Sequence, residues 1–259
     1  MTVETFARVT VAAYIVIVVG TVLWRALSWP HGWRLWLLSV VDNLYLRLCF
    51  QWRANRCCPF LDERSAIVVA NHCSPLDPTI IWVGVTNGRP LECMAAQEYF
   101  DIPGLSFIMK NMRAIPVARK GKDIAATREA LRRLKVGCYL GIFPEGGINR
   151  GSGFLPWDTG IAWLALHSRV PVYPVFIHNA PLADDMVSQF YTFQHVRVTY
   201  GDPVDLKAWY GKRINAELLR EVTDLLRNRL AELGGLELPP AEPAGDHPPE
   251  ILKIPQAAG

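Results

Sequence analysis

Two long apolar segments open the chain and differ in their polar positions. Residues 6–24 are almost wholly apolar, interrupted by Arg8, two threonines and Gly20. This length is about what is needed to cross the hydrocarbon core of a membrane. A secretory signal peptide is the alternative, although Glu4 stands near the amino end and no clear small-residue cleavage motif follows. Residues 33–50 predict a second, mostly apolar helix in which a narrow polar stripe recurs at helical spacing.

This helix pair is expected to anchor the chain to a membrane through residues 1–52. Five of the nine tryptophans lie in this segment, and indole rings prefer the headgroup region of a bilayer. Residues 29–32, Trp-Pro-His-Gly, predict a sharp turn between the helices. The pair could cross the bilayer as a hairpin or lie half-sunk in one leaflet, and the sequence leaves both arrangements open.

After about residue 60, short apolar runs alternate with amphipathic segments. Residues 66–70 are wholly apolar, as is typical of a buried strand, and residues 214–233 carry apolar side chains on one helical face. The alternation predicts an α/β domain over residues 53–235, with a mostly parallel central sheet flanked by helices. Residues 236–259 contain six prolines and are expected to form a disordered tail. The other strands are expected at 91–95, 114–117, 138–143, 170–177 and 195–200, and the other helices at 79–85, 123–135 and 159–168.

Composition supports the membrane assignment and bears on the side of the membrane. Hydrophobic residues make up 51% of the chain, and the net charge of +3 gives no reason to expect nucleic acid as a partner. Five arginines against one aspartate between residues 25 and 56 favour an anionic lipid surface, by roughly 1 kcal/mol per charge. Arg25 and Arg34 follow the first helix, against Arg8 within it, so the rest of the chain is expected on the cytoplasmic side of the cell membrane. The six cysteines show no paired spacing, as expected of reduced thiols.

The first candidate chemistry follows the strand expected at 66–70. Residues 71–78, NHCSPLDP, predict a tight turn and the start of a helix. A histidine at the end of a strand with an aspartate five positions later suggests a general base, His72, oriented by Asp77. A structural role is also open, because Asp77 before a proline is a good helix N-cap and Ser74 with Asp77 resembles a capping box.

Two further segments offer chemistry. Residues 143–147, FPEGG, end another expected strand, and the carboxyl ends of parallel strands are where sites form in α/β folds. Glu145 could be a cap or a site residue, and the two glycines could make the turn or let the backbone approach a ligand. Residues 113–122 carry two arginines and two lysines, which suit a phosphate, although a solvated basic loop is the alternative.

Four ordered segments together resemble the glycerolipid acyltransferase family, the PlsC-like group of 1-acylglycerol-3-phosphate acyltransferases. The resemblance covers roughly residues 50–205. The two N-terminal helices are also similar to the membrane-anchoring pair of some members. The four segments are Asn-His-x4-Asp at residues 71–77, IPVAR at 115–119, FPEG at 143–146 and VPVYPV at 170–175.

The resemblance implies acyl transfer from a thioester, either acyl-CoA or acyl carrier protein, to the hydroxyl of a lysophospholipid. The leading acceptor is 1-acylglycerol 3-phosphate, in phospholipid biosynthesis. His72 would be the general base and Asp77 its orienting partner, with no metal and no cofactor beyond the acyl donor. Arg119 would hold the acceptor phosphate. The residues assigned to substrate binding are Asn71, Ser74, Arg113, Arg119, Glu145, Gly146, Gly147, Arg150, Pro171 and Val172.

Within this set, Glu145 and Gly146 would line the acceptor site, with backbone N–H groups near their turn as oxyanion donors. Pro171 and Val172 would shape the acyl pocket. One segment departs from the family pattern, which usually continues Gly-Thr-Arg-Ser where this chain reads Gly-Gly-Ile-Asn at residues 146–149.

If the missing arginine of the family pattern binds phosphate, then Arg150, Arg119 or Arg113 must replace it, or the acceptor differs. Glycerol 3-phosphate, another lysolipid or an amino-lipid therefore stay open as acceptors.

Two other classes of protein also stay open. A non-catalytic lipid-binding protein on the same fold would explain the altered third segment. A hydrolase would use Ser74 or Cys73 as nucleophile, although the sequence contains no Gly-x-Ser-x-Gly elbow.

Overall fold

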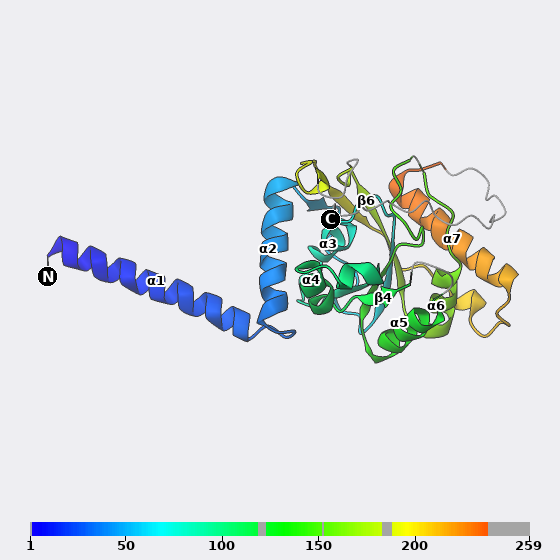
Figure 1. Ribbon diagram of the computed structural model, residues 1–259, viewed down its shortest axis with the longest axis horizontal. Helices are drawn as coiled ribbons and strands as arrows, with labels where there is room; N and C mark the ends of the chain where they lie inside the picture. Colours follow the sequence, from blue (N-terminus) through cyan, green and yellow to red (C-terminus); the bar gives the residue numbers. More distant parts are fainter. Residues whose placement is uncertain (1, 119–122, 152, 183–187, 238–259) are drawn as a thin grey trace, which may run out of the picture.

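The computed structural model describes residues 2–118, 123–151, 153–182 and 188–237, in which a central sheet lies between two layers of helices (Figure 1). The seven strands have the order β1-β7-β6-β2-β5-β3-β4. Neighbouring strands are parallel except for β6 and β7, which are antiparallel. The predicted α/β fold with a mostly parallel sheet is therefore confirmed. The strands are β1 Arg53–Ala54, β2 Ala66–Ala70, β3 Leu91–Ala96, β4 Ile115–Val117, β5 Tyr139–Ile142, β6 Val172–His178 and β7 Arg197–Tyr200.

Helices cover both faces of this sheet. α2, α3 and α4 lie on one face, and α5, α6 and α7 lie on the other (Figure 1). The sequence did not predict β1, α4 or the three short 3-10 helices. The helices are α1 Val3–Leu27, α2 Trp33–Cys49, α3 Asp77–Trp82, α4 Leu105–Asn111, α5 Ile124–Val136, α6 Gly160–Ser168, α7 Ala216–Gly234, η1 Gln97–Phe100, η2 Ser188–Phe190 and η3 Lys207–Trp209.

The central strand β2 explains why its sequence is apolar throughout. All five of its residues are buried, because both faces of a mostly parallel sheet are covered by helices. Val68 and Ala70 point into the core beneath α2 and α3, whereas Ile67 and Val69 point into the core beneath α5, α6 and α7. β2 is thus fixed from both sides, and so is the start of the segment that follows it.

Local signals set the ends of the helices around this sheet. Asp123 caps α5 by accepting a hydrogen bond from the backbone N–H of Ala126, and Asn215 caps α7 in the same way through Leu218. α5 ends before Gly137, whose φ of +115° few other residues adopt. These boundaries agree with the sequence within one or two residues.

The two N-terminal helices differ in how they relate to the domain. No residue of α1 is buried, and within the described part of the chain it is the one helix long and apolar enough to cross a membrane. A signal sequence would satisfy the same criteria of length and composition. α2 instead packs one face on the domain, where Leu35 and Leu46 are buried in the core shared with α3 (Figure 1). α2 is therefore attached to the α/β domain along its length.

Gly84, just after α3, lies against the ring of Tyr200, and this contact can be tested. A Cβ at Gly84 would lie 1.9 Å from the Tyr200 hydroxyl oxygen, and Tyr200 is buried in the core. We expect Gly84→Ala to lower the free energy of unfolding by about 1–3 kcal/mol, because the ring must shift. Gly84→Ala combined with Tyr200→Phe removes the clashing oxygen and should recover most of that loss in thermal unfolding. A Gly84→Ala protein as stable as the wild type would contradict this packing.

Candidate active site

The candidate site lies at the carboxyl ends of β2 and β5, which are neighbours in the sheet. β2 ends at Ala70, and the next residues leave the sheet in a tight turn that leads into α3 at Asp77. β5 ends at Ile142, and residues 143–149 form a second turn beside the first. The predicted order of strand, turn and helix is confirmed around His72.

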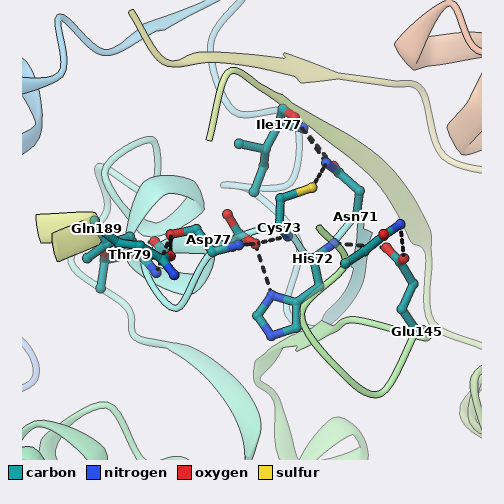
Figure 2. A network of polar contacts seen from close by, with 11 residues as sticks. Asn71, His72, Cys73, Asp77, Thr79, Glu145, Ile177 and Gln189 are labelled. Atoms are coloured by element: carbon teal, nitrogen blue, oxygen red, sulfur yellow. Dashed lines mark hydrogen bonds and ion pairs between the residues drawn. The ribbon is translucent and has the colours of Figure 1, made fainter. Parts of the chain in front are cut away.

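His72 and Asp77 come together across the first turn (Figure 2). The ring nitrogen Nδ1 of His72 lies 2.9 Å from Oδ2 of Asp77. The Asp77 side chain is fully buried, whereas the His72 side chain keeps 19% of its surface exposed. The pair therefore joins a buried carboxylate to an imidazole that solvent or substrate can reach.

The same carboxylate oxygen also holds the backbone of the turn. The N–H groups of Cys73 and Ser74 donate to Oδ2 of Asp77 at 2.7 and 2.8 Å. An ionised carboxylate can only accept hydrogen bonds, so we assign the proton of the neutral imidazole to Nδ1 of His72. Nε2 is then the basic nitrogen, and Figure 2 shows it on the side of the ring turned away from Asp77.

Phe143, at the end of β5, fixes the plane of the imidazole. Its ring lies 4.4 Å from the His72 ring, centroid to centroid, with an interplanar angle of 28°. The hydrogen bond to Asp77 and the stack on Phe143 together restrict rotation of the His72 side chain. The sequence placed Phe143 in a family segment, but it offered no signal for this contact.

The second turn holds both backbone groups of His72. Oε1 of Glu145 accepts the N–H of His72 at 3.0 Å, and the N–H of Asn149 donates to the His72 carbonyl at 2.7 Å. Oε2 of Glu145 accepts hydrogen bonds from the side-chain Nδ2 of Asn149 and from the backbone N–H of Leu155. Burial raises the pKa of Glu145 above its ordinary value, and the N–H groups of Leu155 and His72 act in the opposite direction.

Glu145 was predicted to line the acceptor site, but the structure buries its carboxylate among these donors. Its contacts position the backbone of His72. Asn149, which the sequence registered only as a departure from the family pattern, completes the arrangement.

Asn71 holds the turn against β6. Its side-chain Oδ1 accepts the N–H of Ile177 at 2.8 Å, and its Nδ2 donates to the Ile177 carbonyl at 3.0 Å (Figure 2). The side chain thereby continues the pairing of β2 with β6 beyond the last strand residue. Asn71 is buried, so its predicted role in substrate binding gives way to a structural one.

Ser74 and Cys73 also face inward. The hydroxyl of Ser74 donates to Oε1 of Gln189 at 3.0 Å and accepts the N–H of Leu76, and Ser74 is fully buried. Burial raises the pKa of Cys73 to about 12, so the thiol stays neutral at physiological pH. Neither the Ser74 hydroxyl nor the Cys73 thiol is placed as a nucleophile. Ser74 was predicted to bind substrate, but its buried hydroxyl binds Gln189 and Leu76 instead. Gln189, 115 positions away, was not predicted.

The two glycines of the second turn differ in whether their backbone N–H has a hydrogen-bond acceptor. Gly146 is exposed, has a φ of +67° and donates its N–H to the Phe143 carbonyl, so this N–H is already used. The N–H groups of Gly147 and Ile148 have no acceptor among the described residues. They directly precede Asn149, whose N–H holds the backbone carbonyl of His72.

The structure separates the predicted arginines. Arg113 lies before the amino end of β4, where Nε is 3.2 Å from the buried carboxylate of Glu92. Glu92 also pairs with Arg133 at 2.9 Å. In the sheet, Glu92 pairs with Leu140 and Leu140 with Ile67, so the ion pair of Arg113 lies toward the amino ends of the strands, away from the turn of His72. Arg150 is exposed and follows Asn149 directly, and Arg119 lies outside the described residues.

Pro171 and Val172 are likewise at the far edge of the sheet. Val172 begins β6 and pairs with Ile67, whereas Val175 pairs with Ala70 at the end where the site lies. The Pro171 carbonyl accepts the N–H of Ile67, and Val172 is buried beneath the helices of the other face. These two residues were predicted to shape the acyl pocket, and the structure places them at the end of the sheet away from His72.

Residues 51–178 match the acyltransferase family, and the match includes both turns of the site. Over this range the chain carries the acyltransferase domain, and it is similar to the PlsC-like glycerolipid acyltransferases. Among the described residues of this acyltransferase, no group of three His, Cys, Asp or Glu side chains is placed to hold a metal ion.

Individual relatives of this acyltransferase carry related names. The chain is 24% identical over 216 residues to a 1-acyl-sn-glycerol-3-phosphate acyltransferase of Cocos nucifera, covering 79% of this chain and 69% of that one. It is 29% identical over 163 residues to an N-acylphosphatidylethanolamine synthase of Arabidopsis thaliana, covering 54% and 55%. It thus spans only part of each relative.

A solved structure is similar in fold. The 1-acyl-sn-glycerophosphate acyltransferase PlsC from Thermotoga maritima aligns with a TM-score of 0.63 at 24% identity, covering 88% of this chain and 93% of that one. The two proteins share the arrangement of sheet and helices described above.

The pairing of Asn71 with Ile177 leads to a stability prediction. In Asn71→Asp, a carboxylate oxygen replaces the donor that faces the Ile177 carbonyl in a buried position. We expect the free energy of unfolding to fall by about 1–3 kcal/mol, because a buried acceptor loses its partner. Asn179→Asp is the matched control, since Asn179 donates to the His195 carbonyl from an exposed position just after β6. Equal stability of the two variants in denaturant unfolding would contradict the proposed role of Asn71.

Proposed function

We propose that this acyltransferase transfers a fatty acyl group from acyl-CoA or acyl carrier protein to the hydroxyl of a lysophospholipid. The leading acceptor is 1-acylglycerol 3-phosphate, as the name of the Cocos nucifera relative suggests. The observation that carries the proposal is the His72–Asp77 pair at the sheet edge, with Nδ1 bound to a buried carboxylate and part of the imidazole still exposed.

In this reaction His72 acts as the general base. Nε2 takes the proton from the acceptor hydroxyl as the oxygen attacks the carbonyl carbon of the thioester. The tetrahedral intermediate collapses, the C–S bond breaks, and the leaving thiolate receives the proton from the imidazolium. Asp77 keeps the ring in the required tautomer and stabilises its positive charge. Both substrates are bound together, so no acyl-enzyme forms.

The second turn supplies the group that stabilises the intermediate. The N–H groups of Gly147 and Ile148 lack acceptors among the described residues and lie next to the residue that bonds to His72. We assign them to the oxyanion, in place of the Gly146 N–H, which the Phe143 carbonyl occupies. Arg150, which follows Asn149, and Arg119 are the candidates for the acceptor phosphate.

The alternative acceptors follow from the same site. An N-acylphosphatidylethanolamine synthase is among the relatives, so an amino-lipid acceptor is the second candidate. The base, its orienting carboxylate and the oxyanion donors serve an amine as well as a hydroxyl. A non-catalytic lipid-binding protein would not need a partly exposed imidazole that Asp77 and Phe143 hold in one orientation.

The enzyme would work at a membrane. α1 is long and apolar enough to span the hydrocarbon core, and none of its residues is buried. Arg25 and Arg34 follow α1, against Arg8 within it, which favours a cytoplasmic position for the α/β domain. The lysolipid acceptor would then reach His72 from the cytoplasmic leaflet.

Replacement of His72 tests the mechanism. We expect His72→Ala to lower the rate of acyl transfer by about 10²–10⁴-fold while the protein stays folded, because only the base is lost. His167→Ala is the matched control, since His167 is exposed on α6, which covers the other face of the sheet. Thiol release is measured with acyl-CoA and acyl carrier protein donors against a panel of lysolipids, glycerol 3-phosphate and amino-lipids, and products are identified by mass spectrometry.

The outcomes separate the candidates. Near-normal transfer by His72→Ala would rule out His72 as the base. Product from one acceptor class defines the acceptor, and lysolipid binding without turnover by any donor would leave the lipid-binding protein as the function.

A further inference from the structure

A short aromatic segment lies exposed beside the site. It comprises η2 and the three residues after it, residues 188–193, and we call it the aromatic segment. Tyr191 has 72% of its surface exposed and Phe193 has 60%, and Phe190 is also exposed. Three large aromatic side chains exposed within four residues indicate a surface that a membrane or another molecule covers.

The aromatic segment is fixed to the carboxyl half of α2. The Tyr45 hydroxyl donates to the Phe190 carbonyl at 2.6 Å, and the Phe193 ring meets the buried Phe50 ring edge-on at 5.8 Å. Figure 1 shows this part of the chain, in yellow, next to the upper end of α2. The segment and the helix therefore present one surface.

That surface continues along the outer face of α2. Its exposed apolar side chains are opposite the face that packs on the domain, and they lead toward α1, none of whose residues is buried. The continuity with a helix able to span a membrane identifies the occupant as a lipid bilayer. Tyrosine at the edge of such a surface suits the headgroup region. The exposed apolar residues of α2 are Trp33, Leu37, Val40, Val41, Leu44 and Leu48.

The aromatic segment also contacts the first turn of the site. Gln189 is buried, and its Oε1 accepts the hydroxyl hydrogen of Ser74 at 3.0 Å. The Ser74 N–H donates to the Asp77 oxygen that binds His72. Two hydrogen bonds thus connect a residue of the aromatic segment to the carboxylate that orients the base.

We propose that the aromatic segment is a lipid-contacting element, and that Gln189 is a positioning residue that links it to the turn carrying His72. This deepens the proposed function, on which its catalytic part rests. The segment holds the edge of the site at the bilayer surface, where an embedded lysolipid presents its hydroxyl. Gln189 keeps Ser74, and through it Asp77, in the orientation that the base requires.

Photo-cross-linking tests the lipid contact without any need for turnover. The full chain is placed in vesicles of phosphatidylethanolamine and phosphatidylglycerol that contain a trace of a phospholipid with a diazirine on its acyl chain. We expect lipid adducts on the aromatic segment and on the outer face of α2, and none on the α5 peptide that carries the equally exposed Val136. No adduct on the aromatic segment would overturn the proposal. Protein–protein cross-links through this segment would instead identify a second copy as the occupant.

Activity separates the two roles. In Tyr191→Ser/Phe193→Ser we expect transfer to a vesicle-embedded acceptor to fall about tenfold or more, because two apolar rings no longer enter the lipid. Transfer to a short-chain acceptor dissolved in the surrounding water should stay within about twofold. Val136→Ser should leave both rates unchanged. Equal losses on the two acceptors, or none on either, would contradict the lipid contact.

Gln189→Leu tests the positioning role. We expect kcat to fall about tenfold on both acceptors with KM nearly unchanged, because the base is misoriented while the binding surfaces remain. In the cycle of Ser74→Ala, Gln189→Leu and their combination, the double variant should lose no more than the larger single loss. Additive losses, or a rise in KM alone, would contradict the link. If wild-type protein transfers no acyl group, the proposed function fails while the cross-linking result still stands.

Discussion

One carboxylate oxygen sets the geometry of the whole site. Oδ2 of Asp77 accepts the N–H groups of Cys73 and Ser74 and binds Nδ1 of His72. Without it, two buried backbone donors would lose their acceptor and the imidazole its fixed tautomer. The sequence suggested a helix cap and a catalytic role for Asp77 as alternatives. In the structure Leu76 is the N-cap of α3, and the Asp77 oxygen closes the turn before it and also binds the candidate base.

The second turn fixes the backbone of His72, as Asp77 fixes its side chain. Glu145 and Asn149 take up the N–H and carbonyl of His72, so the base is fixed relative to two neighbouring strands. Phe143 adds the remaining restraint on the ring. These described residues of the family segments therefore hold His72 in place. The imidazole and the N–H groups of residues 147 and 148 are the groups that we propose act on the thioester.

Local patterns predicted the parts of this arrangement that depend on neighbours in sequence. The buried strand before His72, the turn after it and the cap at Asp123 all follow from a few adjacent residues. Contacts between distant segments could not be predicted in this way, as with Gln189, whose partner is 115 positions away. Arg113 and Val172 were misplaced for a related reason. Arg113 precedes a family segment and Val172 lies within one, yet a strand that rises roughly 3.3 Å per residue separates residues near its amino end from those at its carboxyl end.

The same geometry narrows the question of the acceptor. Arg113 pairs with the buried carboxylate of Glu92, which Arg133 also binds, and this ion pair lies away from the turn that carries His72. Where the family pattern has threonine and arginine, Gly147 and Ile148 offer two backbone N–H groups with no acceptor among the described residues. Neutral N–H donors stabilise a developing oxyanion well, but they select a doubly charged phosphate over other acceptor groups only weakly. If they serve the oxyanion, recognition of a phosphate must come from cations outside this turn, and Arg150 is the nearest of these in sequence. Under the proposed mechanism, the choice of acceptor is therefore separable from the His72–Asp77 pair.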